Sequence, residues 1–82
     1  METAKKFSRQ QLEEALAALD SGKYGMVLRA KGIVNGGEDG WLEFDFVPGE
    51  YELRRHHADV TGRLVVIGAQ LDEAGVAALF GL

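Results

Sequence analysis

The apolar pattern predicts an amphipathic helix near the start of the chain. Four apolar residues recur at the i, i+3, i+4, i+7 spacing of one helical face: Leu12, Ala15, Leu16 and Leu19. Ser8 stands before this stripe, and Gln11 follows three residues later, as in a capping box. Gly22 is a natural C-terminal stop. We therefore expect a helix that begins after Ser8 and ends before Gly22.

Alternation of apolar and polar residues predicts a strand over residues 25–34. The residues expected to point toward the core are Met26, Leu28, Ala30 and Val34. Arg29 and Lys31 then lie on the opposite face, because successive strand side chains alternate. Residues 35–40 are polar and rich in glycine, which indicates a loop.

A β-hairpin is predicted over residues 41–57. Two alternating segments, 41–47 and 50–57, flank Pro48-Gly49, which suits the central positions of a type II turn. A two-residue turn would pair Val47 with Glu50, Phe46 with Tyr51, Phe44 with Leu53, and Glu43 with Arg54. This register collects apolar residues on one face and charged residues on the other, which favours the hairpin.

The last two elements complete an α+β fold. Residues 63–68 contain an unbroken apolar run after Arg63, which indicates a central strand, although the same pattern also fits a helix. Asp72 can cap a final helix that contains Val76, Leu79 and Phe80. The predicted order is αββββα, with a four-stranded, mainly antiparallel sheet and both helices on one face. Residues 1–82 form a single domain, of which residues 1–6 are expected to be flexible.

The sheet face away from the helices is the main candidate for function. The residues predicted to share it are Arg29, Lys31, Trp41, Glu43, Asp45, Glu52, Arg54 and His56. Such a face is either a solvated surface with weak ion pairs or a polar docking surface, and the sequence leaves both open. Acids lie between the basic residues and would repel phosphate, which disfavours nucleic acid. The partner-docking candidates are Arg29, Lys31, Trp41, Glu43, Asp45 and Arg54.

Composition excludes several classes of function. The 82 residues carry a net charge of −4, which argues against binding to nucleic acid through phosphate neutralisation. There is no cysteine, so thiolate metal sites and disulfides are impossible. No apolar run has membrane-spanning length, and the start lacks the hydrophobic stretch of a signal peptide. We expect a cytoplasmic protein with no membrane or nucleic-acid partner.

No catalytic machinery is evident in the sequence. There is no G-x-x-x-x-G-K-[ST] phosphate loop and no supported Ser-His-Asp arrangement. His56 and His57 are weak metal candidates, with Glu52 and Asp59 as possible oxygen ligands. Adjacent strand residues point to opposite faces, so surface histidines at a strand end are the favoured interpretation. We predict no enzyme activity, no metal site and no cofactor in this chain.

The sequence resembles the C-terminal domain of the CobW family of P-loop GTPases. The resemblance is carried by residues 24–34, 41–49, 63–68 and 71–73, and it covers about residues 7 to 82. Its most specific part is the Leu28-Arg29-Ala30-Lys31-Gly32 strand combined with the later strand that ends in Ile67-Gly68. The family's Walker lysine, magnesium site and C-x-C-C metal motif belong to the preceding GTPase domain and are not found in this sequence.

The resemblance implies a non-catalytic interaction or regulatory domain of a GTPase that delivers metal ions or supports cobalamin biosynthesis. Its partners would be a CobW-type GTPase domain, a client metalloprotein, or both. Arg29 and Lys31 match the family's basic strand. Two alternatives stay open: an accessory metal-binding module that uses His56 and His57, and an orphan interaction domain that acts in trans.

Overall fold

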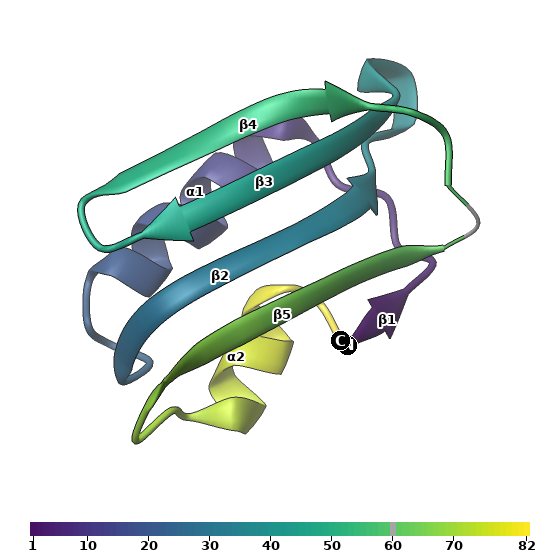
Figure 1. Ribbon diagram of the computed structural model, residues 1–82. Coiled ribbons are helices and arrows are strands. Elements are labelled where there is room, and N and C mark those ends of the chain that lie inside the picture. The colour runs from purple at the N-terminus through teal and green to yellow at the C-terminus, as the bar shows by residue number, and fades with distance from the viewer. Residues whose placement is uncertain (60) are drawn as a thin grey trace.

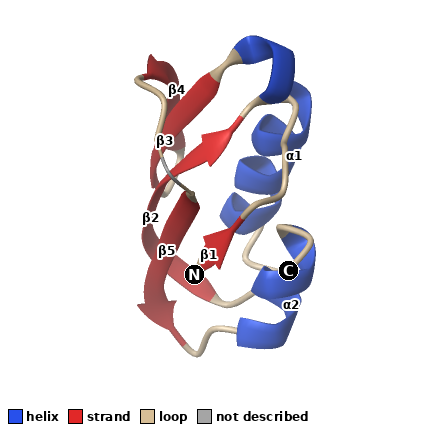
Figure 2. Cartoon of the chain, turned by 90° about the vertical axis from the view of Figure 1, so that its right-hand side faces the viewer, coloured by secondary structure: helices blue, strands red, loops and turns tan. Residues whose placement is uncertain are grey.

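The computed structural model describes residues 1–59 and 61–82 and shows two layers, a sheet and a pair of helices (Figures 1 and 2). Both helices cover the same face of the sheet, as predicted, and leave the other face open. The elements in chain order are β1 (Glu2–Thr3), α1 (Arg9–Asp20), β2 (Met26–Asn35), the 3₁₀ turn η1 (Gly37–Asp39), β3 (Trp41–Val47), β4 (Glu50–His56), β5 (Gly62–Ala69) and α2 (Glu73–Leu79).

Helix α1 begins at the predicted capping box. The Gln11 backbone N–H donates to Ser8 Oγ at 3.0 Å, and the Ser8 backbone N–H donates to Gln11 Oε1 at 2.9 Å. These two bonds satisfy donors that a helix N-terminus otherwise leaves unpaired. The four apolar residues of the predicted stripe are the buried residues of this helix. The local pattern therefore determines both where the helix begins and which face it buries.

Replacing Ser8 with alanine is expected to lower the free energy of unfolding by about 0.5–2 kcal/mol, because the cap bond to the Gln11 N–H is lost. Urea denaturation followed by circular dichroism measures this change. A denaturation midpoint that stays at the wild-type value, with an unchanged m-value, would show that the cap does not contribute.

All strand pairs of the sheet are antiparallel, and the strand order is β1-β5-β2-β3-β4. The hairpin formed by β3 and β4 has the predicted register, with Val47 opposite Glu50 and Glu43 opposite Arg54. Gly49 has a φ of 82°, which suits the second central position of a type II turn. Strand β5 returns to pair with β2, which makes β2 and β5 neighbours although two strands separate them in sequence.

The sheet has five strands, so the predicted four-stranded sheet and the order αββββα are wrong. The additional strand is β1, in which Glu2 lies opposite Arg63 and Thr3 opposite Gly62. In the segment expected to be flexible, residues 1–6, Thr3 is buried and Lys6 forms a parallel bridge with Asn35. A two-residue strand is too short to show an alternating pattern in the sequence. It forms because β5 offers a free edge with which it can pair.

Of the four β2 residues predicted to point toward the core, only two do so. Ala30 and Val34 are fully buried, whereas Met26 is 64% exposed and Leu28 is 52% exposed. Between Val27 and Arg29 the register against β5 shifts, as it does at a β-bulge. The extra residue reverses the alternation, so that Val27 points to the core in place of its neighbours.

The core lies between the sheet and the two helices. Phe80, which follows α2, stacks on Phe44 of β3 with ring centroids 6.1 Å apart, and it meets Phe7 edge-on at 6.4 Å. Helix α2 begins with the predicted cap, in which the Gly75 N–H donates to the Asp72 carboxylate at 3.0 Å. The buried apolar side chains that form the core are Phe7, Leu12, Ala15, Leu16, Leu19, Val27, Ala30, Val34, Leu42, Phe44, Phe46, Leu64, Val76 and Phe80.

Candidate functional site: the open face of the sheet

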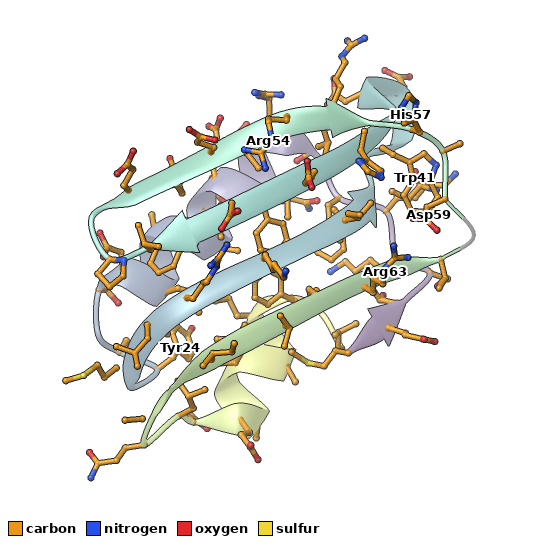
Figure 3. The ribbon with its side chains drawn as sticks, viewed as in Figure 1. Tyr24, Trp41, Arg54, His57, Asp59 and Arg63 are labelled. Carbon is orange, nitrogen blue, oxygen red and sulfur yellow. The ribbon has the colours of Figure 1, made fainter. Side chains whose placement is uncertain are left out.

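The open face, which is the sheet surface opposite the helices, faces the viewer in Figure 3. Strand pairing places opposite residues on the same side of a sheet. Lys31 lies opposite Asp45, and Asp45 lies opposite Glu52; Glu43 lies opposite Arg54. The eight residues predicted to share this face therefore do so: Arg29, Lys31, Trp41, Glu43, Asp45, Glu52, Arg54 and His56.

Three ion pairs connect these side chains. Arg29 Nη2 lies 3.5 Å from Asp45 Oδ2, and Arg54 Nε lies 3.2 Å from Glu43 Oε1. Arg54 also pairs with Glu52 of its own strand. The hydrogen bond from Arg54 to Glu43 raises the pKa of the Arg54 guanidinium, and the nearby carboxylates raise it further. These pairs are solvated, so they orient the side chains more than they stabilise the fold.

Lys31 stands apart from this network. Within residues 1–59 and 61–82, its ammonium group forms no ion pair, although it lies between Asp45 on β3 and Val65 on β5. A shallow depression of about 590 Å³ lies over β2, β3 and β5, and Arg29, Lys31, Glu43 and Asp45 all contribute to its lining. The face therefore presents Lys31 without an ion-pair partner in a hollow where Arg29, Glu43 and Asp45 each form an ion pair.

Trp41 lies at the end of the sheet, away from the depression. It pairs with Asn35 on one side and His56 on the other, and its side chain is half-buried. Figure 3 shows His57, Asp59 and Arg63 near the same end. Arg63 Nη2 lies 3.0 Å from Asp59 Oδ2, and this hydrogen bond raises the pKa of Arg63. Trp41 thus marks a second region of the face rather than the centre of the charged network.

The two candidate metal ligands lie close together. His56 is the last residue of β4 and His57 follows it, so strand alternation no longer separates their side chains. Their ring centroids are 5.8 Å apart. In the part of the chain that the structure describes, no group of three or more histidine, aspartate or glutamate residues could hold a metal ion. The pair therefore offers at most two imidazole ligands.

We expect the purified, untagged chain to contain well under one zinc per molecule, because a structural zinc site needs four ligands. Its thermal midpoint should stay constant when a chelator is added, and the double variant His56→Ala, His57→Ala should contain the same amount of zinc. Elemental analysis and thermal melts measure both quantities. Stoichiometric zinc that is lost together with the fold would favour the alternative of a metal-binding module.

An apolar patch that the sequence pattern did not predict lies on the same face. It consists of Met26 and Leu28 on β2 and Val65 and Ile67 on β5, each between 43% and 64% exposed. Ile67 lies opposite Arg29, the residue that follows Leu28, and Met26 lies opposite Ala69, two residues beyond Ile67. Val65 precedes Ile67 by two residues and therefore shares its face. One signal was present in the sequence: an unbroken apolar run is also the pattern of a strand with two apolar faces.

Comparison with known proteins identifies the family of this domain. The family model described as "Cobalamin synthesis protein cobW C-terminal domain" matches residues 1–81. The chain belongs to the CobW C-terminal domain family. The match is to the C-terminal domain of the family, and the 82 residues contain no G-x-x-x-x-G-K-[ST] phosphate loop. No curated protein matches it significantly.

A solved structure is similar to this CobW C-terminal domain over nearly its whole length. The match is to the structure titled "Crystal structure of Zn(II)-bound YjiA GTPase from E. coli", with 26% sequence identity and a TM-score of 0.76. It covers 98% of this chain but only 27% of the YjiA chain. The domain therefore spans about a quarter of the relative. Among the helices of the described residues, none is long and apolar enough to cross a membrane.

Proposed function

We propose that this domain is the interaction and regulatory domain of a CobW-like GTPase, and that its open face is the docking surface. The observation that carries the proposal is the charged network of that face, in which Arg29 and Arg54 pair with carboxylates while Lys31, within the described residues, forms no ion pair. Neither Arg29 nor Lys31 is buried in the core, so folding does not account for their presence. Arginine and aromatic residues are common anchors of protein interfaces.

The partner in this proposal is a GTPase domain, a client metalloprotein, or both, and the setting is cytoplasmic metal-ion delivery or cobalamin biosynthesis. Support comes from the family name, which links the domain to cobalamin synthesis, and from the relative, whose title describes a zinc-bound GTPase. The domain itself would supply no cofactor and no catalytic group. Its role would be to hold the GTPase and the client in contact.

Reversing the charge of Arg29 and Lys31 together tests this function. We expect Arg29→Glu, Lys31→Glu to weaken binding to the GTPase domain encoded in the same reading frame by at least about tenfold, or 1.4 kcal/mol. If that frame encodes none, the CobW-family GTPase of the same genome is the partner to use. Isothermal titration calorimetry measures the affinity, and circular dichroism checks that the fold is kept.

The matched control is Lys23→Glu, Arg55→Glu, which changes the net charge equally. Lys23 lies in the loop before β2, and Arg55 is opposite Leu42, so its side chain is on the helix side of the sheet. Both residues are exposed. Equal weakening by the test pair and the control pair would show that the effect comes from net charge alone. Unchanged affinity in the test pair would remove Arg29 and Lys31 from the site.

A further inference from the structure

The apolar patch of Met26, Leu28, Val65 and Ile67 is the feature of the open face that the charged network does not explain. Half-exposed aliphatic side chains scattered singly are ordinary, but a contiguous group on one surface marks an interaction site. Covering apolar area is favourable by about 25 cal/mol per Å². Binding of a partner that removed these four side chains from water would therefore be favourable.

The bulge in β2 creates this patch. Without the extra residue, the alternation would send Leu28 to the helix side, as the sequence pattern predicts. With it, Leu28 and Arg29 both lie on the solvent side, and Val27 fills the core. Bulges often re-aim a side chain at a functional surface. Gly68, opposite Val27, permits the bulge, because an added Cβ would lie 2.1 Å from the Met26 carbonyl oxygen.

The patch is continuous with the proposed docking surface. Arg29 lies opposite Ile67, and Lys31 lies opposite Val65, so the two basic residues separate the apolar side chains from the acids of β3. A partner that fits this surface has an apolar centre flanked by a carboxylate that can meet Lys31. Apolar centres with charged rims are the usual composition of protein interfaces.

The course of β1 indicates which partner reaches this position. Glu2 lies opposite Arg63 and Thr3 opposite Gly62, and Met1 exchanges backbone hydrogen bonds with Leu64. Because β1 is antiparallel to β5, a chain that continued the strand before Met1 would run along β5 toward Ile67. A domain carried on that chain is held beside the patch at high effective concentration. In the YjiA GTPase, about three quarters of the chain lies outside the region matched here.

We infer that the apolar patch is covered by the GTPase domain that precedes this domain in the same polypeptide. The inference rests on the proposed function and names the partner and the centre of its interface. Leu28 and Ile67 are the anchors, and Lys31 lies at the rim. The charged network then orients the two domains, while burial of the patch holds them together.

The test compares aspartate substitutions in the patch with one outside it. The probe is the GTPase segment from the same reading frame, bound in trans to the 82-residue chain in calorimetry. If that frame holds no such segment, the inference is overturned. We expect Leu28→Asp and Ile67→Asp each to weaken binding at least about tenfold. Leu82→Asp, at an exposed leucine beyond α2, should leave the affinity unchanged.

The outcomes separate this inference from the proposed function. If Arg29→Glu, Lys31→Glu weakens binding while Leu28→Asp and Ile67→Asp do not, the docking function stands and the patch is not its centre. If none of these variants weakens binding, both are wrong. The wild-type chain could instead fail to bind the GTPase segment and sediment as a dimer that Ile67→Asp dissociates. In that case a second copy covers the patch and the inference is overturned.

Discussion

Replacing Phe80 with alanine is expected to lower the free energy of unfolding by about 3–5 kcal/mol. The ring has no solvent exposure and contacts elements from both layers: it stacks on Phe44 of β3 and meets Phe7, which precedes α1. Its removal leaves a cavity where α2 joins the sheet. A domain of this length has a total stability of roughly 4–12 kcal/mol, so this single change removes a large fraction of it.

Urea denaturation with fluorescence of Trp41 measures the effect of Phe80→Ala. Leu82→Ala is the control, because Leu82 is 44% exposed and its truncation should change the stability by less than about 0.5 kcal/mol. A loss below about 1 kcal/mol for Phe80→Ala would show that the contact between α2 and the sheet is not part of the cooperative core.

Replacing Gly68 with alanine is expected to cost about 3 kcal/mol, at the upper end of the effect of overpacking. The new Cβ would lie 2.1 Å from the Met26 carbonyl oxygen and 2.9 Å from Leu71 Cδ2. The first of these contacts is with backbone, which no rotamer change can relieve. The strand pair must therefore separate locally, and the bulge that exposes Leu28 must rearrange.

Gly49→Ala is the control for this substitution. An alanine Cβ there meets nothing within 4 Å, so its cost comes only from the positive φ, roughly 1–2 kcal/mol. Denaturation gives the stabilities, and amide NMR spectra show whether shifts spread through β2 and β5 in Gly68→Ala alone. Gly68 has no positive φ, so a cost below about 0.5 kcal/mol for Gly68→Ala would mean that the close approach of β2 and β5 there carries no strain.

The two substitutions have different consequences for docking. Phe80→Ala acts on the helix side and leaves the open face intact in the molecules that remain folded. Gly68→Ala acts on the strand pair that presents Leu28 and Ile67. If the apolar patch binds the GTPase domain, only Gly68→Ala should weaken the affinity of the folded fraction.

Local patterns were sufficient for the elements whose signals lie within a few residues of one another. The capping box at Ser8, the cap at Asp72 and the turn at Gly49 were all predicted and are present. The hairpin register followed from the turn length and from side-chain alternation, because one face of β3 is buried and Leu53 of β4 packs against the core on the same side. The same reasoning placed Arg29 and Lys31 on the open face.

The remaining features depend on contacts between segments that are far apart in sequence. Strand β1 exists because β5 offers an edge, and Leu28 is exposed because Gly68, forty residues later, leaves space for a bulge. Alternation alone could not reveal either, since both arise from the partner strand. The sequence therefore determined the charged residues of the candidate site, whereas tertiary pairing of β2 with β5 decided that an apolar patch lies beside them.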